Sequence, residues 1–162
     1  METKIKLKKE NILRVGIDDE NGNDTGNYLE FDLDDIELPL KWQNVEVEHK
    51  KNLNYLKTNF AVIQKKPIKE GKKLMSNRQE ERLKVLKEFY VREMKNLDTI
   101  LGEGGCEKIL HGRQPYYSLF EDVLDYLDQL EPYFEQGLKN AKQKVIDKYK
   151  IDEEDLDKII EG

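Results

Sequence analysis

A run of apolar residues at helical spacing in the middle of the chain is the strongest constraint on its fold. These residues recur in steps of three or four and are Leu83, Leu86, Tyr90, Met94, Leu97 and Leu101. Val85, Phe89 and Val91 widen the apolar face beyond the narrow seam of a coiled coil, which favours a helix in a bundle core. Ser76 followed by Gln79 has the form of a capping box and predicts where this helix begins.

Glycines end this helix and open a junction that spans residues 97–120. Gly102 stands where a helix C-terminus favours a residue that can take positive φ, and Gly104 and Gly105 prolong the break. Residues 106–111 have the spacing of one or two helical turns, which Gly112 stops. We expect the next helix to begin near Pro115, because proline suits the first turn of a helix.

Two further helical segments follow the junction. The first is marked by Leu119, Phe120, Val123, Leu124, Leu127 and Leu130, and we expect Pro132 to break or kink it. The second would run from Tyr133 to Tyr149, with Gly137 as a weak point in its interior. Residues 151–162 form an acidic tail, in which Asp152 is a candidate N-cap of a short helix.

The beginning of the chain has the two-residue period of strands. Residues 4–7, 13–17 and 29–33 alternate apolar and polar side chains, with a polar loop at residues 18–26. Helical spacing covers residues 38–64, and a lysine-rich linker at residues 65–75 leads to a helical core at residues 76–150. The sequence therefore predicts an α+β fold that is mostly α: a small antiparallel sheet within residues 1–36 and a bundle of four to five helices, in a single domain of residues 1–162.

Composition favours an interaction protein over an enzyme with a deep pocket. The 162 residues are 38% charged and 37% hydrophobic, the net charge is −6, and Cys106 is the one cysteine. A single cysteine makes no internal disulfide and no apolar run has the length of a membrane span, so we expect a soluble, cytoplasmic protein without a membrane partner. The acidic balance argues against nucleic acid as the main partner.

Few residues are arranged for chemistry. The loop at residues 18–26 lacks the glutamate that ends a calcium loop of the EF-hand type, since Leu29 stands at that position. His49, His111 and one cysteine have no zinc spacing. Cys106 and His111 could approach each other as nucleophile and base, but their separation puts them on poorly matched faces of a helix. We predict no catalytic residue, no cofactor and no metal.

The glycine junction also carries a motif. It contains Leu97, Asp98, Ile100, Leu101, Gly102, Gly104 and Gly105, then Cys106, Lys108, Ile109, Leu110, Gly112 and Arg113. Together with the strand-to-helix segment FDLDDIELPLKW at residues 31–42, this order resembles the tail assembly chaperone family of long-tailed bacteriophages and prophages. In that family a long helix ends in a D-x-hydrophobic-hydrophobic-G-x-G turn, followed by a short helix and an aromatic-rich final pair of helices. The resemblance covers residues 28–150.

The resemblance implies a function in tail assembly. Such a protein would bind the tape-measure protein, an apolar and helix-rich rod, keep it soluble, and help recruit the major tail protein that polymerises around it. The family also implies self-association, action in the host cytoplasm, absence from the finished virion and, in some members, a longer frameshifted form. On this interpretation we assign partner binding to residues of the junction, namely Leu101, Gly102, Ile109, Leu110, Tyr116, Tyr117 and Phe120.

Three other interpretations stay open. A generic helical adaptor or structural virion protein would have the same sequence pattern, and a structural protein would remain in purified particles. A nucleic-acid-binding regulator would use the lysines of residues 64–73, and its binding would fall steeply with salt. A thiol enzyme would require Cys106 to react unusually fast at neutral pH.

Overall fold

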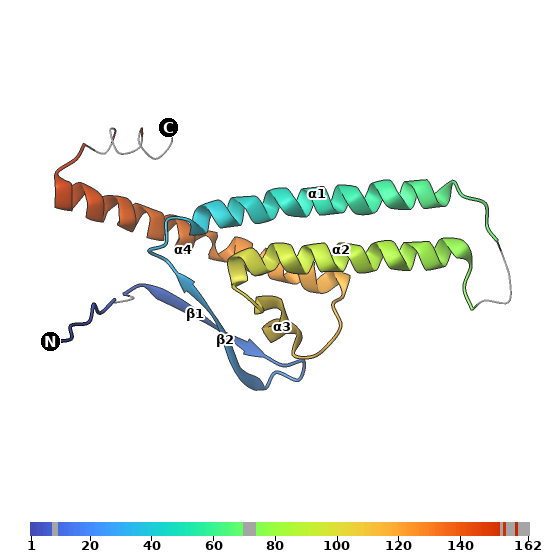
Figure 1. Cartoon of the computed structure of the whole chain (residues 1–162), viewed down its shortest axis with the longest axis horizontal. Coiled ribbons are helices and arrows are strands. Elements are labelled where there is room, and N and C mark those ends of the chain that lie inside the picture. Colours follow the sequence, from blue (N-terminus) through green and yellow to red (C-terminus); the bar gives the residue numbers. More distant parts are fainter. Residues whose placement is uncertain (8–9, 70–73, 153, 155–157, 159–162) are drawn as a thin grey trace. The chain divides into compact units, whose positions relative to one another are not determined.

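The computed structural model describes residues 1–7, 10–69, 74–152, 154 and 158. Its elements, in chain order, are β1 (Ile12–Asp18), β2 (Asp24–Asp32), α1 (Leu38–Gln64), α2 (Asn77–Leu101), α3 (Gly105–Leu110) and α4 (Tyr117–Tyr149) (Figure 1). The predicted fold class is confirmed, because a two-stranded antiparallel sheet precedes a set of helices that makes up most of the chain.

The chain divides into two compact units. The sheet unit comprises Met1–Leu40 and Asp125–Gly162, and the hairpin unit comprises Lys41–Leu124. The sequence analysis predicted a single domain of residues 1–162, and this stays a prediction.

In the sheet unit, α4 covers one face of the β1–β2 hairpin. The antiparallel register places Val15 opposite Leu29, and Leu29 and Phe31 are both buried. The ring of Phe31 lies 5.7 Å from that of Phe134 on α4. Residues between these positions, such as Glu30, are exposed on the other face, so the alternation in β2 reflects one covered and one open side.

Gly137 brings the backbone of α4 against the chain that leaves β2. A Cβ atom at this position would lie 1.9 Å from the backbone oxygen of Leu33, so any larger residue would push the two segments apart. The expected weak point inside the helix is therefore a position where the packing requires glycine.

Of the two outcomes expected at Pro132, a break is wrong, because α4 runs without interruption from Tyr117 to Tyr149, and a kink stays a prediction. Pro132 and the residue one turn before it, Asp128, are both exposed, so the carbonyl that loses its helical N–H partner is on the solvent side. Leu130 and Phe134 are buried on either side of the proline and hold both parts of the helix against the protein. In the part of the chain that the structure describes, the four helices α1 to α4 thus meet the lower limit of the predicted range.

The predicted strand at residues 4–7 is also wrong. Residues 1–7 belong to no helix or strand, and Ile5 and Leu7 are 92% and 90% exposed. An alternating pattern becomes a strand only where a neighbouring strand supplies hydrogen bonds, and here none does among the described residues. Most of the short helix expected to begin at Asp152 lies at residue 153 and beyond, largely outside the described residues.

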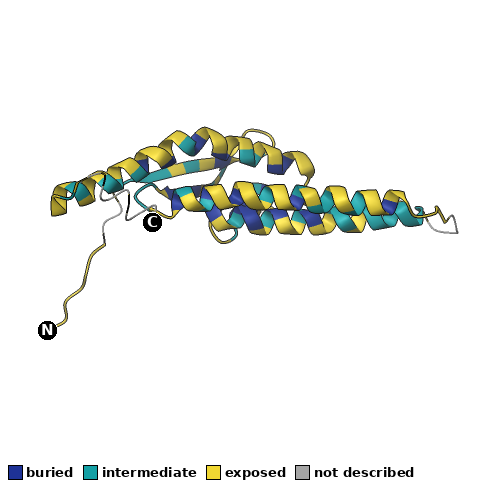
Figure 2. Cartoon of the chain, turned by 90° about the horizontal axis from the view of Figure 1, so that it is seen from above, coloured by how far each residue is buried: buried dark blue, intermediate teal, exposed yellow. Residues whose placement is uncertain are grey.

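In the hairpin unit, α1 and α2 lie side by side and antiparallel (Figure 1). Ser76 caps α2 as predicted: its side chain accepts the N–H of Gln79, and the Gln79 side chain accepts the N–H of Ser76. The buried positions of α2 are Phe89, Glu93, Asn96, Leu97, Ile100 and Leu101. They all lie in the second half of the helix, and intermediate and exposed colours predominate toward the loop end of the hairpin in Figure 2.

Candidate interaction surfaces

The turn between α2 and α3 is built around Asp98. Its backbone oxygen accepts the N–H of Gly102 at 3.0 Å, and its side-chain Oδ1 accepts the N–H of Cys106 at 2.9 Å. The N-cap of α3 is Gly104, which has no side chain to satisfy the first N–H groups of that helix. Asp98 supplies the missing acceptor from the preceding helix, and this gives the aspartate of the sequence motif a structural role.

Two positions of the junction require glycine for different physical reasons. Gly102 ends α2 with φ of 93°, a conformation that side chains disfavour. Gly105 has an ordinary φ, but a Cβ atom there would lie 2.5 Å from the Cβ of Leu101. The first glycine is needed for the direction of the backbone, and the second for the close approach of α3 to the end of α2.

The seven residues predicted to bind a partner separate into two groups. Leu101, Leu110 and Phe120 are in the core, with exposures of 6%, 0% and 1%, and Ile109 is half-buried. Gly102, Tyr116 and Tyr117 are exposed. A partner can reach the second group directly, but it can reach the core residues only if the hairpin unit opens.

Aromatic side chains join α4 to α2 within the hairpin unit. The ring of Phe89 lies 6.4 Å from Phe120 in an edge arrangement, and Tyr90 lies 5.5 Å from Phe120. Tyr117 stacks on Phe89 at 6.1 Å with an interplanar angle of 29°. A hydrogen bond to the Glu121 carboxylate raises the pKa of Tyr117, so its hydroxyl stays protonated and able to donate.

Cys106 is a core thiol. Its Sγ lies 3.7 Å from the backbone oxygen of Met94, and the residue is 2% exposed. Burial raises the pKa of the thiol well above its usual range, and the nearby Asp98 carboxylate raises it further. His111 is exposed at the end of α3 and donates its N–H to the backbone oxygen of Glu107. A neutral, buried thiol argues against a nucleophilic role for Cys106.

A buried polar cluster between α1 and α2 has no counterpart among the sequence predictions. Glu93 is 0% exposed, and its two carboxylate oxygens lie 2.6 Å from His49 Nδ1 and 2.5 Å from Asn52 Nδ2. One turn later, Asn96 is buried and donates to the backbone oxygen of Val45 at 3.0 Å. The signal in the sequence was the position of Glu93, which falls at helical spacing between the apolar residues Phe89 and Leu97.

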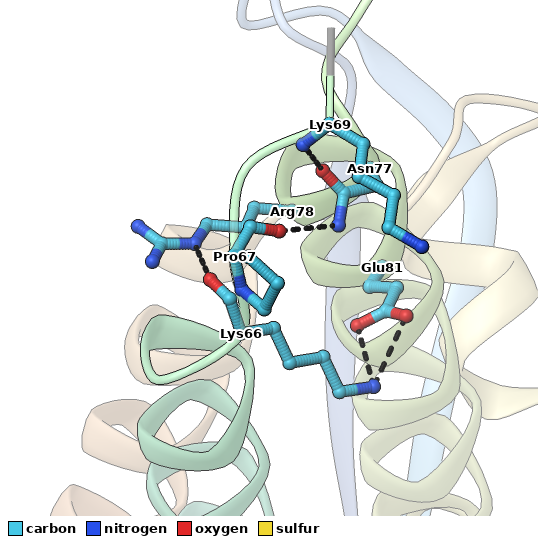
Figure 3. Close-up of polar contacts among 6 residues, drawn as sticks. All are labelled: Lys66, Pro67, Lys69, Asn77, Arg78 and Glu81. Atoms are coloured by element: carbon cyan, nitrogen blue, oxygen red, sulfur yellow. Dashed lines mark hydrogen bonds and ion pairs between the residues drawn. The ribbon is translucent and has the colours of Figure 1, made fainter.

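At the loop end of the hairpin, polar contacts tie the linker to the first turns of α2 (Figure 3). Lys66 Nζ lies 3.1 Å from both carboxylate oxygens of Glu81, and Arg78 Nε donates to the backbone oxygen of Lys66 at 2.6 Å. The side chain of Asn77 accepts the N–H of Lys69 at 2.7 Å. Because Lys66 is already paired with a carboxylate, the described part of the linker offers less cationic surface than the sequence alone indicates.

The same end of the hairpin exposes large apolar side chains. The loop-end apolar residues are Val62, Ile68, Leu74 and Leu83, with exposures of 54%, 56%, 98% and 54%. Two of these residues, Leu74 and Leu83, line a shallow depression of about 450 Å³ together with Met75, Gln79 and Arg82. Leu83 was predicted to lie in the core of the bundle, and its exposure corrects that prediction for the first turns of α2.

The polar loop between β1 and β2 is held by its own side chains. Asp19 Oδ1 accepts the N–H groups of Asn21 and Asn23, both at 2.9 Å. The described residues contain no cluster of three or more histidine, cysteine, aspartate or glutamate side chains that could hold a metal ion. Within the same residues, no helix combines the length and the apolar character needed to cross a membrane.

Comparisons of the chain with protein-family models, with curated proteins and with solved structures gave no match.

Proposed function

We propose that the chain is a non-catalytic binding protein for apolar helical segments, and specifically a phage tail assembly chaperone whose client is the tape-measure protein. The observation that carries the proposal is the exposure of the loop-end apolar residues, two of which, Leu74 and Leu83, line the depression. Apolar side chains that are exposed beside one another, as Leu74 and Leu83 are, mark binding sites more often than ordinary surface. An amphipathic helix of a partner could cover them with its apolar face.

The junction supports the specific form of the proposal. The aspartate and glycines that resemble the chaperone motif have defined structural tasks, since Asp98 caps α3 and Gly105 allows α3 to approach Leu101. On this proposal the major tail protein is a second partner, and the protein acts in the host cytoplasm and is absent from the finished virion.

The proposal changes which residues are expected to meet the partner first. Leu101, Leu110 and Phe120 are buried, so they contribute to the rigidity of the hairpin unit. The loop-end apolar residues and the exposed rings of Tyr116 and Tyr117 are the surface that a helix can contact without unfolding the protein.

Co-expression with the tape-measure protein of the same phage or prophage tests the proposal. We expect the tape-measure protein to stay soluble and to co-purify with the wild-type chain. The Val62→Lys/Leu83→Lys variant should lose this effect, whereas the control Lys50→Glu/Lys57→Glu, which changes exposed positions on α1, should retain it. A tape-measure protein that precipitates equally with and without the wild-type chain would contradict the proposal.

A further inference from the structure

We propose that residues 3–7 of one copy of the chain add as a third strand to the outer edge of β2 in a second copy. This segment, hereafter the arm, and the β1–β2 hairpin both belong to the sheet unit. The inference concerns how two copies of this chain associate, and it does not depend on the chaperone proposal.

The outer edge of β2 has backbone groups available for a further strand. Leu33 donates its N–H to the oxygen of Asn11 at 2.9 Å, so Leu33 directs its backbone groups toward β1. In an antiparallel pair this direction alternates, so Phe31 also faces β1, whereas Tyr28 and Glu30 face the outer edge. Among the described residues, no backbone group of another segment bonds to Tyr28 or Glu30 at that edge.

The arm has the side-chain pattern that such a strand requires. Ile5 and Leu7 alternate with Lys4 and Lys6, and the two apolar side chains are 92% and 90% exposed. Placed beside β2 with its apolar side chains toward the covered face, the arm would continue the apolar row of β2 at the sheet edge. Its five residues match the length of residues 28–32.

Charge selects β2 over β1 as the acceptor strand. The exposed face of β2 carries Glu30, which also pairs with Arg14 of β1 at 3.0 Å, and Asp32. The exposed face of β1 carries Arg14 and, at the last position of the strand, Asp18. Lysines of the arm would therefore lie beside carboxylates on β2 and beside a guanidinium on β1. Opposite charges on neighbouring strands stabilise a sheet, and like charges directly opposite each other destabilise it.

The same charges disfavour docking of the arm on β1 of its own chain. A turn at residues 8–10 that directs the apolar side chains to the covered face would set Lys4 opposite Arg14. A longer turn at residues 8–12 would set Lys6 opposite Arg14 instead. Both registers pair two cations, so pairing with β2 of a second copy is the arrangement that satisfies the apolar and the charged residues together.

Sedimentation velocity over a range of protein concentrations tests the proposal. We expect wild-type protein to form a dimer or a longer assembly, and we expect Ile5→Lys/Leu7→Lys to shift association to concentrations at least about tenfold higher, because two apolar side chains no longer become buried. The matched control is Val47→Lys, an exposed apolar residue of the hairpin unit that belongs to neither proposed binding surface. Wild-type protein that is monomeric throughout, or an arm variant that associates like wild type, would overturn the proposal.

Charge reversal tests the acceptor strand. Lys4→Glu/Lys6→Glu and Glu30→Lys/Asp32→Lys should each associate more weakly than wild type, and an equimolar mixture of the two should associate more strongly than either alone. Circular dichroism of each variant checks that the fold is retained. A mixture that associates no better than its components would overturn the assignment to β2.

Discussion

The two ends of the α1–α2 hairpin have the same secondary structure and use their side chains differently. Near the junction, Phe89 and Leu110 are 0% exposed and the Glu93 carboxylate is fully buried between His49 and Asn52. Near the loop, Leu83 is 54% exposed, and the polar contacts, such as Lys66 to Glu81, lie at the surface.

This difference indicates that the junction end of the hairpin serves stability and the loop end serves binding. Burial and buried hydrogen bonds at the junction end supply most of the stability of the unit. The loop end contributes little to the core and retains apolar surface for a partner. Substitutions at the two ends should therefore separate stability from binding.

The largest difference is expected between two large-to-small substitutions on α2. Phe89 contacts Tyr90, Tyr117 and Phe120, so Phe89→Ala should lower the free energy of unfolding by about 3–5 kcal/mol. Leu83→Ala at the loop end should change it by less than about 0.5 kcal/mol. Urea denaturation measures both, and equal losses would refute the division between the two ends.

The buried carboxylate provides a second comparison. Glu93→Ala would leave His49 and Asn52 without their shared acceptor and should destabilise the protein by about 3 kcal/mol or more. Glu81→Ala removes a partly exposed ion pair and should cost no more than about 1 kcal/mol. Glu93→Gln keeps an acceptor for one neighbour and should fall between them. A Glu93→Ala protein as stable as wild type would show that the buried cluster does not hold α1 to α2.

Gly105, the junction glycine next to Leu101, should be the next most sensitive position to substitution. Gly105→Ala places a Cβ atom 2.5 Å from the Leu101 Cβ and should lower the free energy of unfolding by about 1–3 kcal/mol. Gly16→Ala is the control, because a Cβ there meets nothing within 4 Å. Thermal unfolding followed by circular dichroism compares the two, and a neutral Gly105→Ala would mean that α3 can move away from α2 at no cost.

Local features of the helices could be predicted from the sequence, and features fixed by packing could not. The capping box of Ser76 and Gln79 and the positive φ of Gly102 depend on a few neighbouring residues, so their patterns predicted the structure correctly. Pro132 obeys the local rule for a helix breaker, but buried residues on both sides override it. The alternation at residues 4–7 has no partner strand in the described chain, so it forms none.

The candidate site was predicted only in part for the same reason. Tyr116 and Tyr117 are accessible, but the apolar spacing that selected Leu110 and Phe120 is the spacing of core residues, and they are buried. The pattern that selected Leu83 as core could not reveal that this side chain is 54% exposed in the first turns of α2. Exposure of an apolar residue depends on which elements reach it, and a single helix pattern does not contain that information.

The smallest effect expected at the junction end is the pH response of Cys106. Its folded pKa lies above the unfolded value of 9.0, so the stability that the neutral thiol contributes is fully present below about pH 9 and is lost as the pH rises further. Between pH 8 and pH 10, wild type should lose up to about 1.4 kcal/mol more than Cys106→Ala. Urea denaturation at both pH values measures this difference, and identical losses would mean that the thiol is accessible to solvent.

The most direct test of the central claim combines stability and binding in one variant. Val62→Lys/Leu83→Lys should keep the wild-type melting temperature, because both positions are more than half exposed, and it should fail to co-purify with the tape-measure protein. A variant with unchanged stability that still retains the tape-measure protein would contradict the claim that the loop end of the hairpin is the binding surface.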